Sequence, residues 1–152
     1  MAGQFSLMAS GRLFDTYVAA LQHDIADVPP SATRVGVVRR PTPWFHGPVD
    51  ENVPELAPPD SLLEEVKRRH EELQSTGLED ALAHNRALEE ADYDERYRSH
   101  LESPAAQAAM DDLVDRLVAG EDIALVCYEN TDEKRCHRTI LRTAIEERLQ
   151  AE

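Results

Sequence analysis

The feature that most constrains the fold is a short, unbroken apolar run near the C-terminus, Ile123–Cys127. Its length suits a β-strand, and its lack of polar alternation predicts that both of its faces are covered. A helix-forming segment that ends at Gly120 precedes it, and another follows after a polar loop. Helix, buried strand and helix in this order are typical of layered α/β proteins. The sequence therefore predicts a three-layer α/β fold with a largely parallel central sheet flanked by helices.

The N-terminal third of the chain is divided by its prolines. Gln4–Ala9 is apolar and is predicted as a first strand, and the apolar spacing of Leu13–Leu21 fits a first helix. Arg34–Arg40 is rich in β-branched residues and predicts a second strand, which Pro41 ends because proline removes a ladder donor. The proline-rich stretch Thr42–Pro59 predicts a loop with no regular structure.

The middle of the chain is predicted to be helical. Ser61 and Glu64 have the spacing of a capping box, and Gly77 is a suitable residue to end the helix that they begin. Leu78–Glu102 is polar with regularly spaced apolar residues, which indicates helices packed on one side. Ser103-Pro104 is a helix start with proline at the first helical position. A last helix should bury the face that carries Cys136, Ile140, Ala144 and Leu149.

Size and charge limit the class of protein. A chain of 152 residues suits one domain, residues 1–152, with its own core. It carries 30 acidic against 16 basic residues, a net charge of −14, and only two of the basic residues are lysines. Scattered acid with little lysine favours a halophilic protein over an ordinary acidic one. No stretch approaches the ~20 apolar residues of a membrane helix, and no basic segment opens a signal peptide. We therefore expect a cytoplasmic protein with no membrane partner.

Both cysteines lie near the end of the buried strand. Cys127 ends the strand, and Cys136-His137-Arg138 opens the helix after the loop. In open α/β sheets, ligands bind beyond the carboxyl ends of the strands, and a helix N-terminus favours anions and thiolates. Cys136 is thus a candidate thiolate nucleophile, His137 a candidate acid or base, and Arg138 a candidate anion clamp. Cys127 would resolve a sulfenate or mixed disulfide formed at Cys136.

Alternatives to a reactive thiol remain open. In phosphatase loops an arginine lies six residues after the cysteine that ends the strand, whereas here that residue is Glu133. Both cysteines also suit the core, where a free thiol behaves as a small apolar group. A helix capped by Asn130 would place Cys136 in its second turn, away from most of the dipole field. His46 or Glu129 would have to complete a metal site, so no metal and no cofactor is predicted.

A second hypothesis uses the arginines. Arg39 and Arg40 end the second strand close to Trp44, and arginine beside an aromatic ring can bind phosphate and stack a base. Arg135, Arg138 and Arg142 share a helical face. The alternative interpretation is a solvated face on which arginines form ion pairs with neighbours, such as Arg142 with Glu146. This pattern fits a nucleic-acid-associated module with structural cysteines. The net charge of −14 disfavours duplex binding.

Three stretches, VVRRPTPWF, ELAPPDSLL and ALVCYENTDEKRCHRTIL, carry a family resemblance. Together they are similar to a family catalogued as domain of unknown function 488, over roughly Val35 to Ile145. The resembling residues are Arg39, Pro43-Trp44-Phe45, Glu55–Pro58, Cys127, Glu129 and Cys136-His137-Arg138. Many relatives carry an acidic residue before the strand arginine, where this chain has Val38. The resemblance implies an α/β fold and a shared site where the second strand meets the CHR helix, with no established activity, and the acidic composition looks similar to members from saline habitats.

These observations define one candidate pocket and two hypotheses for it. The first is a site for a small anionic ligand, phosphate-like or nucleotide-like, with a cysteine thiolate as its reactive group. Its candidate catalytic residues are Cys136, His137 and Cys127, and its candidate ligand-binding residues are Arg39, Arg138, Glu129 and Trp44. The second is the nucleic-acid-associated module.

Overall fold

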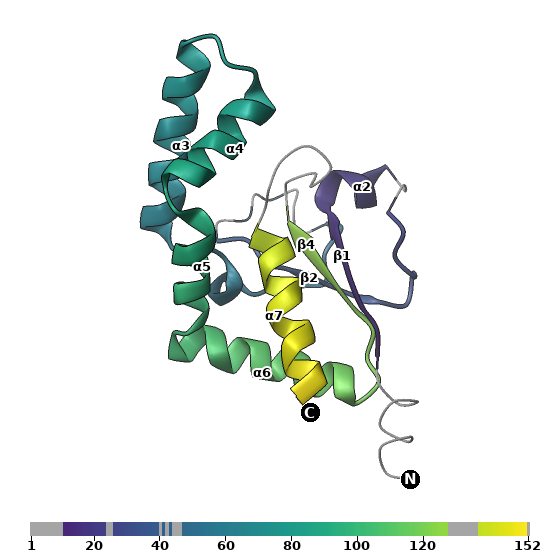
Figure 1. Ribbon diagram of the computed structural model, residues 1–152. Coiled ribbons are helices and arrows are strands. Elements are labelled where there is room, and N and C mark those ends of the chain that lie inside the picture. The colour runs from purple at the N-terminus through teal and green to yellow at the C-terminus, as the bar shows by residue number, and fades with distance from the viewer. Residues whose placement is uncertain are drawn as a thin grey trace.

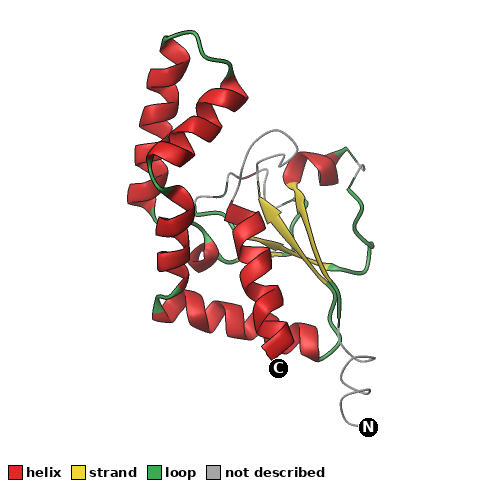
Figure 2. Cartoon of the chain, viewed as in Figure 1, coloured by secondary structure: helices red, strands yellow, loops and turns green. Residues whose placement is uncertain are grey.

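The computed structural model describes residues 11–23, 26–39, 41, 43, 47–127 and 137–151. Its strands form a four-stranded sheet, with helices arranged around it (Figures 1 and 2). In chain order these elements are β1 (Leu13–Tyr17), α2 (Val18–Gln22), β2 (Thr33–Gly36), β3 (Glu51–Asn52), the 3-10 helix η2 (Pro54–Leu56), α3 (Asp60–Ser75), α4 (Asp80–Glu90), α5 (Tyr93–Leu101), α6 (Pro104–Val118), β4 (Ile123–Cys127) and α7 (His137–Ala151).

The strands form one sheet in the order β1-β4-β2-β3, and every pairing is parallel. β4 lies inside the sheet, with Cys127 opposite Tyr17 of β1 and Val126 opposite Gly36 of β2. All five residues of β4 are buried. This confirms the buried strand that the apolar run Ile123–Cys127 predicts.

The connections place helices on both faces of the sheet. The chain passes from β1 over β4 to β2, and it returns from β3 over β2 to β4 in the opposite direction. Right-handed crossovers that run in opposite directions lie on opposite faces. Figure 1 shows α6 and α7 on one side of the sheet and α2 on the other. The predicted three-layer α/β fold with a parallel sheet is therefore confirmed.

α3 and α4 form a helical arm that projects from the sheet (Figure 1). Its turn is made by Gly77 at φ 95°, a conformation that residues with a Cβ rarely adopt. The amides of Gly77 and Leu78 donate to the carbonyls of Gln74 and Leu73, which satisfies the last orphan acceptors of α3. Arg69 of α3 and Glu90 of α4 then pair at 3.0 Å. The predicted helix end at Gly77 is confirmed.

Two early predictions are wrong. Leu13–Leu21 is not one helix, because Leu13–Tyr17 pairs along its length with β4 and only Val18–Gln22 is helical. Phe14, Thr16 and Tyr17 have strand propensity, and strand pairing overrides the helical spacing. The stretch Thr42–Pro59 is not structureless either, since it contains β3 and η2. The strand there is short and lies at the sheet edge, where neighbouring prolines are tolerated.

Other boundaries differ in detail. The sheet strand β2 ends at Gly36, after which Val38 exchanges hydrogen bonds with the side chain of Asn52 at 3.1 and 2.9 Å. The capping box of Ser61 is not formed, because α3 begins two residues earlier, with Pro59 rather than Ser61 at its N-cap. The predicted cap of α6 is confirmed, with Ser103 Oγ accepting from the amide of Ala106 at 3.3 Å. The predicted strand Gln4–Ala9 lies outside the described residues.

α7 buries a face different from the predicted one. Its buried apolar residues are Leu141 and Ile145, while Ile140, Ala144 and Leu149 are only partly buried. Leu141 and Ile145 pack in one core with α6 and β4. This rotation of α7 about its axis directs Arg138 toward the sheet, and Arg138 is buried as well.

Arg116, near the end of α6, forms ion pairs that link this helix to the edge strand β3. Arg116 pairs with Glu121 at 2.7 Å and with Glu51 of β3 at 2.9 Å. The hydrogen bond from Arg116, with a second from Thr33, holds the pKa of Glu121 below its ordinary value of 4.5. A carboxyl group whose pKa is lower in the folded than in the unfolded state stabilises the fold at pH values above its unfolded-state pKa. This contribution is lost as the pH falls through the folded-state pKa.

We therefore expect Glu121→Gln to be less stable than the parent protein at pH 7 and to lose less stability on acidification below about pH 4.5. Urea unfolding midpoints at pH 7 and pH 3.5 measure both differences. Glu102→Gln, at an exposed glutamate, is the matched control and should follow the parent profile. Parallel pH profiles for Glu121→Gln and the parent would contradict the expectation.

Candidate functional site

The start of α7 lies at the carboxyl ends of three strands. His137 and Arg138, its first two residues, contact the end of β1, the end of β4 and the residue after β2. Cys127 ends β4 and is 1% exposed. The structure thus brings together Cys127, His137 and Arg138, as the sequence predicts.

Arg138 binds the cysteine directly. Its Nη1 donates to the sulfur of Cys127 at 3.1 Å and to the carbonyl of Thr16. Its Nε donates to Oδ2 of Asp15 at 3.2 Å. A guanidinium beside a cysteine sulfur stabilises the thiolate relative to the thiol. The buried guanidinium of Arg138 is therefore in direct contact with the sulfur of Cys127.

Asp15 holds two arginines of α7. Its Oδ1 accepts from Arg142 at 2.8 Å while Oδ2 accepts from Arg138. Arg142 also donates to the carbonyl of Leu13 and lies 3.6 Å from Glu146. Arg138 and Arg142 are thus bound to β1. Arg138 is buried, whereas the partly exposed Arg142 also has the Glu146 neighbour that a solvated face predicts. Arg135, the third member of that face, lies outside the described residues.

His137 is held by the backbone after β2. Its Nε2 donates to the carbonyl of Val37 at 2.6 Å, and its ring packs edge-on against Tyr97 at 5.4 Å between centroids. Tyr97 is itself fixed, because its hydroxyl donates to the carbonyl of Leu56 at 2.5 Å. A carbonyl only accepts, so His137 carries a proton on Nε2, and in the neutral ring Nδ1 is the basic nitrogen. The hydrogen bond to the Val37 carbonyl therefore fixes the orientation of the His137 ring.

Arg39 closes one end of the site. Its Nε donates to the carbonyl of Pro58 at 3.1 Å and its Nη2 to the carbonyl of Ala57 at 3.0 Å. These bonds link Arg39, which follows β2, to the two residues Ala57 and Pro58 shortly before α3. Arg39 is thus partly committed to the backbone, with a side chain that still borders the cavity described next.

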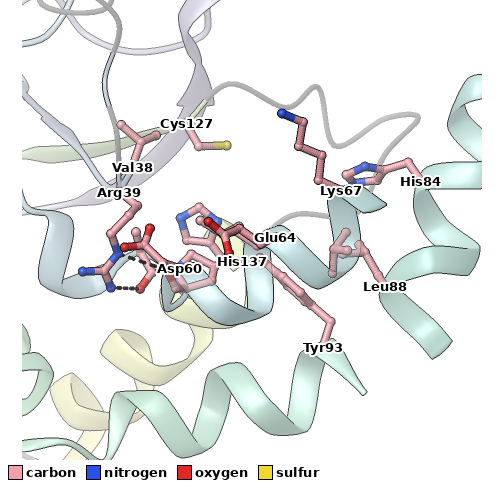
Figure 3. Close-up of a pocket in the computed structure, with 14 residues that line it drawn as sticks. Val38, Arg39, Asp60, Glu64, Lys67, His84, Leu88, Tyr93, Cys127 and His137 are labelled. Atoms are coloured by element: carbon pink, nitrogen blue, oxygen red, sulfur yellow. Dashed lines mark hydrogen bonds between the residues drawn. The ribbon is translucent and has the colours of Figure 1, made fainter. Parts of the chain in front are cut away.

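A cavity of about 350 Å³ lies between the sheet end and the helical arm. Figure 3 shows Cys127, His137 and Arg39 on the sheet side and residues of α3 and α4 on the other. It is lined by Val38, Arg39, Ala57, Pro58, Asp60, Leu63, Glu64, Val66, Lys67, His84, Leu88, Tyr93, Cys127 and His137. Apolar walls with a few converging polar groups are typical of small-molecule sites.

The sequence predicts part of this site and misses part of it. Cys127, His137 and Arg39 line the cavity, and Arg138 lies behind Cys127. Cys136, Glu129 and Trp44 lie outside the described residues, as does Arg40. The sequence does not reveal Asp15, because the spacing of Leu13–Leu21 predicts a helix there. It also misses the wall contributed by α3 and α4.

Within residues 11–23, 26–39, 41, 43, 47–127 and 137–151, no group of three or more His, Cys, Asp or Glu side chains is arranged to hold a metal ion. No helix in that part of the chain combines the length and apolarity needed to cross a membrane.

The fold and site define an α/β protein with a cysteine at the end of a central parallel strand and an arginine behind its sulfur. The chain belongs to the DUF488 family, since a profile described as "Active DUF488-N3 subclade" matches residues 17–149. This confirms the family resemblance carried by the strand arginine and the CHR element. No curated protein and no solved structure matches the chain.

Proposed function

We propose that the protein binds a small anionic substrate in this cavity and attacks it with the thiolate of Cys127. The observation that carries the proposal is the 3.1 Å hydrogen bond from Arg138 Nη1 to the sulfur of a cysteine that lines the cavity. Arg138 stabilises negative charge on the sulfur because its N–H is a cationic donor at hydrogen-bond distance. The description of the matched subclade as active agrees with a chemical role.

The proposed nucleophile is therefore Cys127, with Cys136 left to a supporting role. In the attack, the sulfur of Cys127 forms a bond to the electrophilic atom of the substrate, and the bond to the leaving group breaks with its electron pair. The leaving group then takes a proton, which His137 supplies from Nδ1 when the ring is protonated. Its Nε2–H stays on the carbonyl of Val37, which keeps the ring oriented.

The arginines support a nucleic-acid-binding module less well. Arg138 is buried on Cys127, and Arg142 shares the carboxylate of Asp15. Cations that are paired inside the fold contribute little to phosphate contacts on the surface. The anionic substrate site accounts for the same residues without displacing these pairs.

Alkylation of the native protein by iodoacetamide tests the proposal. Trypsin cleaves after Arg116, Lys134, Arg135 and Arg138, so Cys127 and Cys136 fall in different peptides that mass spectrometry separates. We expect Cys127 to be labelled in the folded protein at neutral pH and the labelling to slow in the presence of inorganic phosphate. Labelling of Cys127 only in urea would show a core thiol and overturn the proposal. Cys136→Ser is the control and should leave the labelling of Cys127 unchanged.

A further inference from the structure

We propose that Lys67 determines the substrate specificity of the Cys127 cavity. Its ammonium group binds an anionic group of the substrate that is separate from the atom attacked by the sulfur of Cys127. The substrate class is then a small organic anion with an apolar body, in which a reactive centre and a separate anionic group are joined. This inference rests on the proposed function of Cys127.

The position of Lys67 is set by the period of α3. Asp60, Leu63, Glu64 and Lys67 line the cavity, and their spacing of i, i+3, i+4 and i+7 places them on one helical face. Leu62 of the same helix is fully buried and helps to hold the helix against the rest of the protein. Lys67 therefore meets the cavity because of how α3 packs.

Lys67 differs in its pairing from the two arginines that follow it on α3. Its neighbours on α3 are paired, Arg68 with Glu72 at 3.1 Å and Arg69 with Glu90 at 3.0 Å. Among the residues that the structure describes, no ion pair to Lys67 is found, although Glu71 lies one turn further along the helix. In a chain with 30 acidic residues and two lysines, a lysine that borders the cavity and has no acidic partner among the described residues is a cation available to a ligand.

The charges in the cavity are divided between its two ends. Figure 3 shows Asp60 and Glu64 beside Arg39 and His137, whereas Lys67 lies with His84 toward the other end. Acidic groups near Arg39 oppose an anion there, and Lys67 favours one at its own end. The apolar side chains of Leu63, Val66 and Leu88 lie along the helical wall and suit an uncharged substrate body. An anionic group is therefore expected at the Lys67 end.

Two alkylating reagents of similar size, iodoacetate and iodoacetamide, test this inference because they differ in charge. The measured quantity is the ratio of their labelling rates at Cys127, in which the thiolate fraction cancels. We expect Lys67→Met to lower the iodoacetate-to-iodoacetamide ratio by about threefold to fivefold, the size of one exposed charge contact. Lys67→Arg keeps the cation and should retain the parent ratio.

Arg68→Met is the matched control. It removes the same charge from the next residue of α3, but Arg68 is paired with Glu72 and does not line the cavity. Its ratio should equal that of the parent protein. An unchanged ratio in Lys67→Met, or an equal fall in Arg68→Met, would overturn the role of Lys67 while leaving the nucleophile in place. Failure of both reagents to label Cys127 in the folded protein would overturn both proposals.

Discussion

Replacement of Asp15 by alanine is expected to lower the free energy of unfolding by about 3–5 kcal/mol. The side chain of Arg138 is 3% exposed and that of Asp15 is 22% exposed, so their pair at 3.2 Å is largely shielded from water. Removal of the carboxylate takes away the acidic group that accepts from the buried Arg138 side chain at Nε, in a place that water does not readily reach. Urea unfolding at pH 7, followed by circular dichroism, measures the loss.

Arg142→Met is the matched control for this effect. It removes the second cation on Asp15, but the side chain of Arg142 is 37% exposed and water can replace its contacts. Its expected cost is at most about 1 kcal/mol, the range of exposed ion pairs. An equal cost for Asp15→Ala and Arg142→Met would mean that burial adds nothing to the pair of Asp15 and Arg138.

The sequence is a good guide where neighbours in the chain decide the structure. β4 could be predicted because five consecutive apolar residues leave no polar face to expose. Gly77 and Ser103 could be predicted because each acts on backbone groups within a few residues. β1 could not, because what makes Leu13–Tyr17 a strand is its pairing with Ile123–Cys127, far along the chain.

The candidate site divides in the same way. Cys127 and Arg138 are 11 residues apart, on either side of one strand-to-helix connection, and their proximity follows from that topology. Asp15 is 123 residues from Arg138, and nothing in the local sequence links them. Lys67 reaches the cavity only through the packing of α3 against the rest of the protein. Sequence spacing also gives no sign that Arg39 is bound to the carbonyls of Ala57 and Pro58.

Replacement of Arg138 by methionine is expected to slow the alkylation of Cys127 at neutral pH by roughly tenfold to a hundredfold. The N–H of Arg138 at 3.1 Å from the sulfur is a charge-assisted donor to the thiolate. Hydrogen bonds to charged groups contribute about 1.5–3 kcal/mol, which sets the size of the expected change in thiolate population. The measurement is the rate of iodoacetamide labelling of the Cys127 peptide as a function of pH.

The pH dependence separates this effect from a general loosening of the fold. A loosened fold exposes the sulfur and speeds labelling at every pH, whereas loss of the donor slows labelling at neutral pH and restores it in alkaline solution, where the thiol ionises unaided. Arg142→Met keeps the bond from Arg138 to Cys127 and should label like the parent protein. Arg138→Lys keeps a cation without the planar fork that joins Asp15, Thr16 and Cys127, so its rate should be intermediate. Faster labelling of Arg138→Met at neutral pH would mean that Arg138 only shields the sulfur, and the nucleophile would then lack the group proposed to activate it.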